Sequence, residues 1–413
     1  MNEPLLSSAD RWVLPGLVAA TFLSLVHYLA FSPLLPAIAA DLQVDVGRMG
    51  QLPAAIGLGA AIIGLVAGPL ADKYGQRRTL LTGMLALVAS SAGLAFLPGI
   101  TALPLIAVLA AVGRAIVYPL ALTISTSEYA GDNQRRAASR VTSSLGAAPI
   151  VGVPLVTAVA AAFDWRAAWL TLGIVTALAY LALWRVFERH SSPRTDNNTS
   201  GRALTAYGQL IKHTPSLALL GGTFLMGIGG WVIWTYLGAF VIQRHQFTTQ
   251  DAGVAWIVVG VGLFGGSVLA GGRLGRVPFE TLFMTCALAA GVCLGAAFIV
   301  PIPAWFAVAL MGIGTLLHGV TQVVTSVLLP RGAPAGRAAT MTARGAASSL
   351  GSATGAALGG LLLEHAGFPA IGTIAVLCCA AAAVLVWCGR AYAPRTEGKL
   401  VSSRPLMTTQ AAT

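Results

Sequence analysis

Runs of about twenty predominantly apolar residues recur from one end of this 413-residue chain to the other. A helix needs about 20 such residues to cross the hydrocarbon core of a bilayer. Backbone groups have no water to bind there, so only helices and closed barrels can span it. The runs do not alternate between polar and apolar residues as barrel strands do. We therefore expect an all-α membrane protein with twelve transmembrane helices, over about 13–35, 49–71, 78–98, 102–124, 141–162, 167–187, 216–240, 252–272, 279–300, 304–328, 344–364 and 367–389.

Composition excludes a soluble protein. The chain is 56% hydrophobic and 9% charged, with a mean hydropathy of +0.79, whereas a soluble domain of this size needs a polar surface. The net charge of +11 does not indicate nucleic acid as a partner, because 21 of the 25 Lys and Arg residues, Arg344 among them, fall in loops and tails on one side of the predicted spans. The positive-inside rule makes that side cytoplasmic. We expect a multi-pass protein of the cell (inner) membrane with both termini in the cytoplasm.

The spans fall into two halves joined by one long polar segment. This segment contains Ser191-Ser-Pro-Arg-Thr-Asp-Asn-Asn-Thr-Ser-Gly201, a composition typical of a flexible linker. The halves repeat, since Ser143-Ser-Leu-Gly146 in the fifth span returns as Ser348-Ser-Leu-Gly351 in the eleventh, 205 residues later. We expect an N-terminal six-helix bundle over 1–187, a cytoplasmic linker over 188–213, a C-terminal six-helix bundle over 214–392 and a cytoplasmic tail over 393–413.

A cluster of charged residues between the second and third spans contains the most specific motif of the sequence. The pattern Gly-x-x-x-Asp-(Lys/Arg)-x-Gly-x-(Arg/Lys)-(Arg/Lys) is met at Gly68, Asp72, Lys73, Gly75, Arg77 and Arg78. It resembles the cytoplasmic loop between helices 2 and 3 of the major facilitator superfamily of transporters. The resemblance implies two parallel six-helix halves related by an axis along the membrane normal, the major facilitator fold. It also implies that these six residues take part in gating.

The eleventh span is expected to start on the cytoplasmic side, so the positive end of its dipole points toward this loop. We expect Asp72 to cap that helix end when the transporter opens outward. In the same state we expect an ion pair between one of the loop cations and one of the carboxylates that follow the fourth span, the candidates being Lys73, Arg77 and Arg78 with Glu128 and Asp132.

Other stretches resemble the twelve-helix drug:proton antiporters of the superfamily. The first span ends in Phe31-Ser-Pro-Leu-Leu-Pro-Ala-Ile-Ala-Ala-Asp41, and Arg114 matches the arginine of the antiporters' helix 4 motif. The glycine expected soon after that arginine is absent. Gly146-x5-Gly152-Val-Pro154 is similar to a degenerate form of the helix 5 signature. This resemblance adds Gly146, Gly152 and Pro154 to the gating residues.

Ionisable residues deep in the predicted spans are candidates for function, because a charge at the bilayer centre is costly. None of the 14 carboxylates falls near the centre of a span, whereas His27, Arg114 and His318 do. They lie on spans 1, 4 and 10, which line the central cavity in this superfamily. Arg114 and His318 are 204 residues apart, so we expect them at matching places in the two halves. The expected substrate-binding residues are Arg114, Tyr118, Trp231, Trp234, His318 and Gln322.

Proton coupling needs a group that changes charge near neutral pH. Histidine does so, whereas arginine keeps its proton. The candidates are therefore His27 and His318, with Glu128 beyond the fourth span as the fallback. A structural role is the alternative for each deep residue. Arg114 would then clamp helix-end carbonyls, and each histidine would bond to a backbone carbonyl.

The sequence contains no catalytic motif. It shows no nucleophile with its base, no metal-ligand cluster and no phosphate-binding loop. We expect no enzyme, cofactor or metal. The predicted function is secondary active transport of small amphipathic molecules by alternating access, as proton-coupled efflux of drugs or metabolites. The alternative is a metabolite or nutrient carrier or uniporter of the same fold without proton coupling, which the missing mid-membrane carboxylate favours. The expected partners are a small-molecule substrate, protons and the lipid bilayer, with no nucleic acid and a monomeric state.

Overall fold

Helices form nearly all of the chain that the structure describes. The computed structural model describes residues 10–96, 99–129, 131–188, 208–210, 212–271, 278–332 and 337–390. Its elements are α1 (Asp10–Leu29), α2 (Phe31–Asp41), α3 (Val46–Met49), α4 (Gln51–Tyr74), α5 (Gln76–Phe96), the 3₁₀ turn η1 (Ile100–Ala102), α6 (Leu103–Ser127), α7 (Gly131–Ala147), the π-helical η2 (Ala148–Gly152), α8 (Val153–Ala162), α9 (Trp165–Glu188), α11 (Thr214–Ala239), the π-helical η3 (Phe240–Arg244), α12 (Thr249–Gly271), α13 (Phe279–Ile299), α14 (Ala304–Gly332) and α15 (Arg337–Arg390). The predicted linker 188–213 lies mostly outside the described residues, and the tail 393–413 lies wholly outside them, so the bundle boundaries stay predictions.

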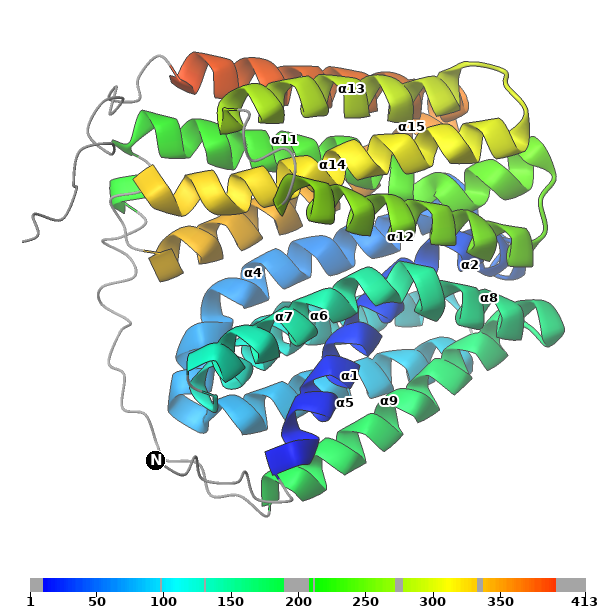
Figure 1. Ribbon diagram of the computed structural model, residues 1–413. Helices are drawn as coiled ribbons and strands as arrows, with labels where there is room; N and C mark the ends of the chain where they lie inside the picture. The colour runs from blue at the N-terminus through cyan, green and yellow to red at the C-terminus, as the bar shows by residue number, and fades with distance from the viewer. Residues whose placement is uncertain are drawn as a thin grey trace, which may run out of the picture.

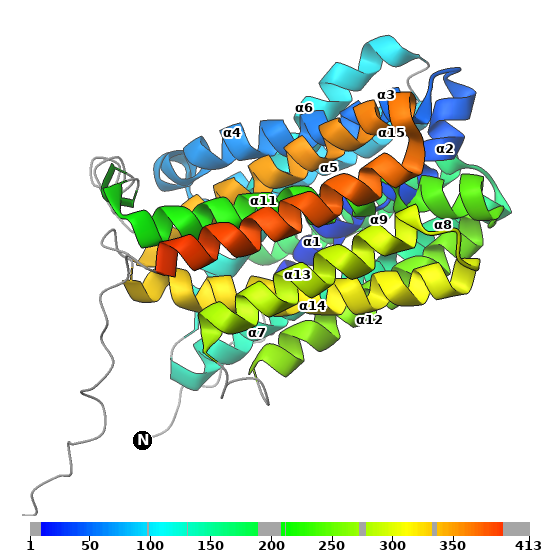
Figure 2. The same cartoon turned by 90° about the horizontal axis from the view of Figure 1, so that it is seen from above.

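The predicted membrane spans are confirmed as helices. Eleven helical stretches of the described residues are long and apolar enough to cross a membrane, and the last of them, α15, covers two predicted spans. Its helix breaks at Gly367, where φ is 72° and ψ is −172°. A positive φ strains any residue with a Cβ, so a glycine stands at the break, and Pro369 follows it. Figure 2 shows the two arms of α15 meeting at a sharp bend. With these arms counted separately, the eleven stretches agree with the twelve predicted spans.

Helix ends differ from the prediction where polar residues continue a helix beyond its apolar stretch. α7 begins at Gly131 rather than near 141, and its first part, 131–140, is strongly polar. α15 begins at Arg337 rather than near 344. Hydropathy identifies only the part of a helix that lies in the hydrocarbon core. The polar first turns of α7 and α15 were therefore not predicted. The first predicted span is two helices, α1 and α2, that meet at Ala30.

The helices pack as two bundles (Figure 1). Helices α1 and α4 to α9 pack with one another, and α11 to α15 do the same. One buried apolar cluster, around Leu80 and Met84, lies within the first bundle. A second, around Phe283, lies within the second bundle. The third cluster crosses between the bundles and contains Ile38 of α2 and Leu237 of α11.

The bundles are joined at one end, which we call the Glu364 end. There Arg48 of α3 forms an ion pair with Glu364 of α15, with 3.3 Å between Nε and Oε1. The backbone N–H of Gly238 in α11 donates to the hydroxyl of Ser32 in α2 at 3.2 Å. These polar contacts lie beside the apolar cluster that crosses between the bundles, so polar and apolar groups close this end together.

At the opposite end, which we call the Asp72 end, each bundle keeps its own apolar cluster. Gly64 and Gly68 of α4 and Gly345 of α15 border open space, because a Cβ on any of them would meet no atom of the described chain beyond its own helix within 4 Å. Asp72 is exposed here. Arg77 forms an ion pair with Glu128 at 2.5 Å, one of the pairs predicted for the outward-open state. The pair joins the start of α5 to the end of α6 within one bundle, so it is formed while the Asp72 end is open.

Candidate functional site

Three helices bring Tyr28 and three of the predicted cavity residues into one row. α1 supplies Tyr28, α11 supplies Trp231 and Trp234, and α14 supplies His318. Ring centroids lie 4.8 Å apart for Tyr28 and Trp231, 5.4 Å for Trp231 and Trp234, and 4.8 Å for Trp234 and His318. All three pairs meet edge to face, a favourable arrangement for aromatic rings. The row crosses from the first bundle to the second.

Arg114 of α6 lies over the first two rings of this row. Its Cζ is 3.5 Å from the ring centroid of Tyr28 and 5.4 Å from that of Trp231. Nη2 donates to the hydroxyl of Ser352 in α15 at 3.4 Å, and the buried Nε has no hydrogen-bond partner in the described chain. No ion pair among the described residues includes Arg114. The aromatic faces therefore take the place of a carboxylate in stabilising this cation.

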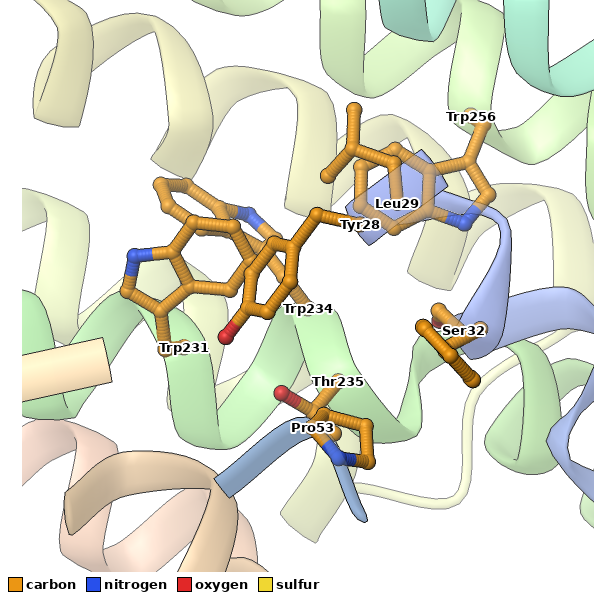
Figure 3. A pocket seen from close by; sticks show the side chains of 9 residues that line it. Tyr28, Leu29, Ser32, Pro53, Trp231, Trp234, Thr235 and Trp256 are labelled. Atoms are coloured by element: carbon orange, nitrogen blue, oxygen red, sulfur yellow. The ribbon is translucent and has the colours of Figure 1, made fainter. Parts of the chain in front are cut away.

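Two small cavities adjoin Tyr28, each of about 10 Å³, which is room for about one water molecule. The first is shown in Figure 3 and is lined by Tyr28, Leu29, Phe31, Ser32, Pro53, Trp231, Trp234, Thr235 and Trp256. The second is lined by Ser24, His27, Tyr28, Phe31, Ile56, Leu87, Ser90, Ala110, Arg114 and Trp169. We call the space formed by these two cavities the chamber. Its lining side chains nearly fill it, so a substrate must displace some of them or bind on their exposed side.

Several polar atoms of this chamber lack a hydrogen-bond partner in the described chain. They include the hydroxyls of Tyr28 and Thr235 and the indole nitrogens of Trp169 and Trp256. Buried polar groups are ordinarily bonded, and leaving one unpaired costs about 1–3 kcal/mol. Unpaired donors and acceptors within an aromatic chamber are typical of a place that receives the polar groups of a ligand.

His27 lines the second cavity, but hydrogen bonds hold its ring from both sides. Nδ1 is 2.8 Å from the carbonyl oxygen of Leu23, and Nε2 is 2.8 Å from the hydroxyl of Ser91 in α5. The carbonyl can only accept, so Nδ1 carries the proton and Nε2 accepts from Ser91. This is the structural hydrogen bond that the sequence left open as the alternative for a deep histidine.

The structure corrects the predicted location of Arg344. The sequence assigned it to a cytoplasmic loop, but it lies seven residues inside α15 and is half-buried. Its Nη2 donates to the side-chain oxygen of Gln322 at 2.7 Å and to the backbone carbonyl of the same residue at 3.0 Å. Gln322 in turn lies 3.0 Å from Nε2 of His318. A second cation therefore borders the predicted site, with no carboxylate paired to it in the described chain.

The other predicted residues of α6, α7, η2 and α8 lie outside the aromatic row. Tyr118 is half-buried on α6. Gly146 is the last residue but one of α7, Gly152 is the last residue of η2, and Pro154 lies in the first turn of α8. The π-helical turn η2 thus falls where the degenerate antiporter signature stands. Such turns are frequent at functional sites.

Replacing Asp72 with asparagine is expected to reduce transport strongly while leaving the amount of protein in the membrane nearly unchanged. The side chain is exposed in this conformation, so its loss removes no core contact. Its expected partner is the start of α15 in the conformation that closes the Asp72 end. Initial transport rates normalised to protein amount test this expectation, and a wild-type rate in the variant would contradict it.

Comparison with known proteins defines the class of this protein. The family model of the Major Facilitator Superfamily matches residues 17–344. The chain belongs to this superfamily: it is a multi-pass membrane protein that transports small molecules, and not an enzyme.

Individual relatives and structures agree with this class. The chain is similar to the chloramphenicol resistance protein of Streptomyces lividans, at 28% identity over 254 residues that cover 60% of this chain and 63% of the relative. It is also similar to the hexuronate transporter of Bacillus subtilis (strain 168), at 25% identity over 276 residues that cover 62% of this chain and 64% of the relative. Less than two thirds of each relative is therefore spanned. A bacterial homologue of the human lysosomal transporter Spinster, solved in an inward-facing and unoccupied conformation, has a TM-score of 0.72 at 16% identity, with 94% of this chain and 96% of that chain covered.

Proposed function

We propose that this protein exports small amphipathic molecules, neutral or weakly acidic, by alternating access and in exchange for protons. The observation that carries the proposal is the position of Arg114, whose guanidinium already lies on the ring of Tyr28 at 3.5 Å. A lipophilic cation would compete with it for the same rings and would approach a like charge. A carboxylate or a neutral acceptor instead meets a partly unpaired donor, and its apolar body meets the indoles of the row.

The Asp72 end is proposed to face the cytoplasm, so that the structure represents an inward-facing state. Two observations support this orientation. Lys and Arg are concentrated in the loops of that end, as the positive-inside rule requires. The bundles are also joined at the Glu364 end, while Gly68 and Gly345 border open space at the Asp72 end.

Export is supported by the similarity to the chloramphenicol resistance protein. A second candidate is a metabolite carrier without proton coupling. The similarity to the hexuronate transporter supports a metabolite as its substrate. A further observation favours this candidate: the two cavities are lined by no carboxylate among the described residues. The two candidates differ in whether the substrate is moved against its gradient when a pH gradient is applied.

The geometry favours His318 over His27 as the proton carrier. Both ring nitrogens of His27 are taken by Leu23 and Ser91. His318 has Nδ1 without a partner in the described chain and contacts the half-buried side chain of Gln322 through Nε2. Glu128 is the fallback, but its carboxylate is paired with Arg77 at the Asp72 end, away from the aromatic row.

Substrate-dependent proton flux in liposomes that contain the purified protein tests the proposal. Added substrate is expected to move protons across the membrane, and His318→Gln is expected to abolish accumulation driven by a pH gradient while sparing substrate exchange. His27→Gln is the matched comparison and is expected to keep at least part of the accumulation, because its ring is held inside the first bundle. If both variants still accumulate substrate as the wild type does, coupling by histidine is wrong. Exchange without proton flux in the wild type would establish the uncoupled carrier instead.

A further inference from the structure

A chain of hydrogen bonds joins α15 to the predicted proton carrier on α14. Nη2 of Arg344 lies 2.7 Å from Oε1 of Gln322, and Nε2 of Gln322 lies 3.0 Å from Nε2 of His318. Arg344 is also held by the backbone carbonyl of Gln322 at 3.0 Å and by the hydroxyl of Thr325 at 3.4 Å. His318 is 1% exposed, whereas Gln322 and Arg344 are partly exposed, so the chain runs from the accessible side of the bundle into its interior.

The donors and acceptors of this chain of hydrogen bonds allow one orientation of the Gln322 amide and one tautomer of His318. A guanidinium only donates, so the amide of Gln322 must turn its oxygen to Arg344 and its NH₂ to His318. Nε2 of His318 must then accept, which makes the imidazole neutral with its proton on Nδ1. Nδ1 is a buried atom without a hydrogen-bond partner in the described chain, so nothing there favours the opposite tautomer.

We infer that Arg344, Gln322 and His318 form a proton-controlled latch, in which Arg344 docks on the Gln322 amide only while His318 is neutral. When Nε2 of His318 takes up a proton from water, this atom changes from an acceptor to a donor. The Gln322 amide must then rotate to offer its oxygen to His318, and its NH₂ faces the donors of Arg344. The docked guanidinium loses its 2.7 Å contact and meets an imidazolium of like charge, so it leaves the amide. Release of the proton restores the first arrangement.

Among the described residues, the groups around His318 include no carboxylate that would compete for the proton on Nε2. α11 places Trp234 and Gly230 against the ring. The carboxylates of the neighbouring helices, Asp251 of α12 and Glu280 of α13, belong to the first turns of those helices, at opposite ends of the bundle. Arg344, which bonds to the same Gln322 amide as the ring, is the charged group that this chain of hydrogen bonds connects to His318.

The latch is connected to the substrate site through α15. Ser352, which accepts from Arg114, lies eight residues after Arg344 on the same helix, which is about 12 Å along its axis. Movement of the start of α15 when Arg344 is released is therefore transmitted to the contact between α15 and Arg114. This inference rests on the proposed role of His318 as the proton carrier and gives that role a structural consequence.

Nuclear magnetic resonance of ¹⁵N-labelled histidine in the purified full-length protein, in lipid nanodiscs, tests the latch without requiring transport. The His318 signal is identified by its loss in His318→Gln. At neutral pH the wild type is expected to show the tautomer protonated on Nδ1. Gln322→Met keeps both Arg344 and His318 but breaks the chain, so the signal is expected to become a mixture of tautomers. Gln322→Glu offers a carboxylate to both neighbours, and His318 is expected to stay protonated to a pH at least about one unit higher.

His27 is the internal control, because its tautomer is set by Leu23 and Ser91 and should not change in any of these variants. A wild-type His318 protonated on Nε2, or a tautomer unchanged in Gln322→Met, overturns the latch. The outcome is separable from the proposed function. Proton-coupled transport with the wrong tautomer disproves the latch alone, whereas the expected tautomers in a protein that moves no protons disprove only the coupling.

Discussion

Replacing Arg114 with glutamine is expected to lower the transport of weakly acidic substrates by about ten- to a hundredfold. The change removes the charge that lies 3.5 Å over the Tyr28 ring and the donor that reaches Ser352. A hydrogen bond between charged groups contributes about 1.5–3 kcal/mol, which corresponds to that range. Initial rates at several substrate concentrations measure the loss. Arg114→Lys keeps the charge but not the planar stacking, so it is expected to lie between the wild type and Arg114→Gln.

Arg166→Gln is the matched control for the loss of an arginine. Arg166 is paired with Asp41 at 2.7 Å, and both are partly exposed. This guanidinium holds the pKa of the Asp41 carboxyl below its usual range. Its replacement is expected to leave transport within about twofold of the wild type, since surface pairs contribute about 0–1 kcal/mol. A wild-type rate for an acidic substrate in Arg114→Gln, at wild-type protein amounts, would remove Arg114 from the substrate site.

Replacing Gly238 with alanine is expected to reduce turnover at least about tenfold, because it obstructs closure of the Glu364 end. A Cβ at this position would lie 2.5 Å from Cα of Pro33 and would also overlap the carbonyl oxygen of Ser32. Both are backbone atoms, so no rotation of a side chain relieves the overlap. The contact exists only while the bundles meet at this end, so the variant should favour the opposite conformation.

The conformational shift can be measured directly. Spin labels on cysteines at Asp45 and His365, two exposed positions on opposite bundles at the Glu364 end, report the distance between them in a variant whose five native cysteines are replaced. Gly238→Ala is expected to lengthen that distance. Gly265→Ala is the matched control, since its methyl group would meet only a side-chain atom of Leu316 at 3.8 Å. An unchanged distance together with wild-type turnover in Gly238→Ala would refute this account of the closed end.

The transmembrane helices could be predicted from the sequence because the bilayer imposes their length and apolar character. The break between the last two spans was marked by Gly367 and Pro369, whose backbone preferences act locally. The start of α7 at Gly131 and the start of α15 at Arg337 could not be predicted in the same way. Both are polar turns that extend beyond the hydrocarbon core, where hydropathy carries no signal.

The candidate site could be predicted only as far as single residues reveal it. Arg114 and His318 were found because an ionisable group deep in an apolar span is rare. The stacking of Arg114 on Tyr28 depends on how α1 packs against α6, and the bond from His27 to Ser91 depends on α1 and α5. No local pattern encodes such packing. Arg344 was missed for the same reason as the start of its helix, since a polar first turn is read as a loop.

The most direct test compares two compounds with the same aromatic body, one with a carboxylate and one with a quaternary ammonium group, in liposomes that contain the purified protein. Under an imposed pH gradient the carboxylate is expected to show saturable, protein-dependent transport, and the ammonium compound is expected to show little. The reason is that Arg114 already supplies the cation of the aromatic chamber. Saturable transport of the ammonium compound at the rate of the carboxylate or above it would contradict the central claim about what this site accepts.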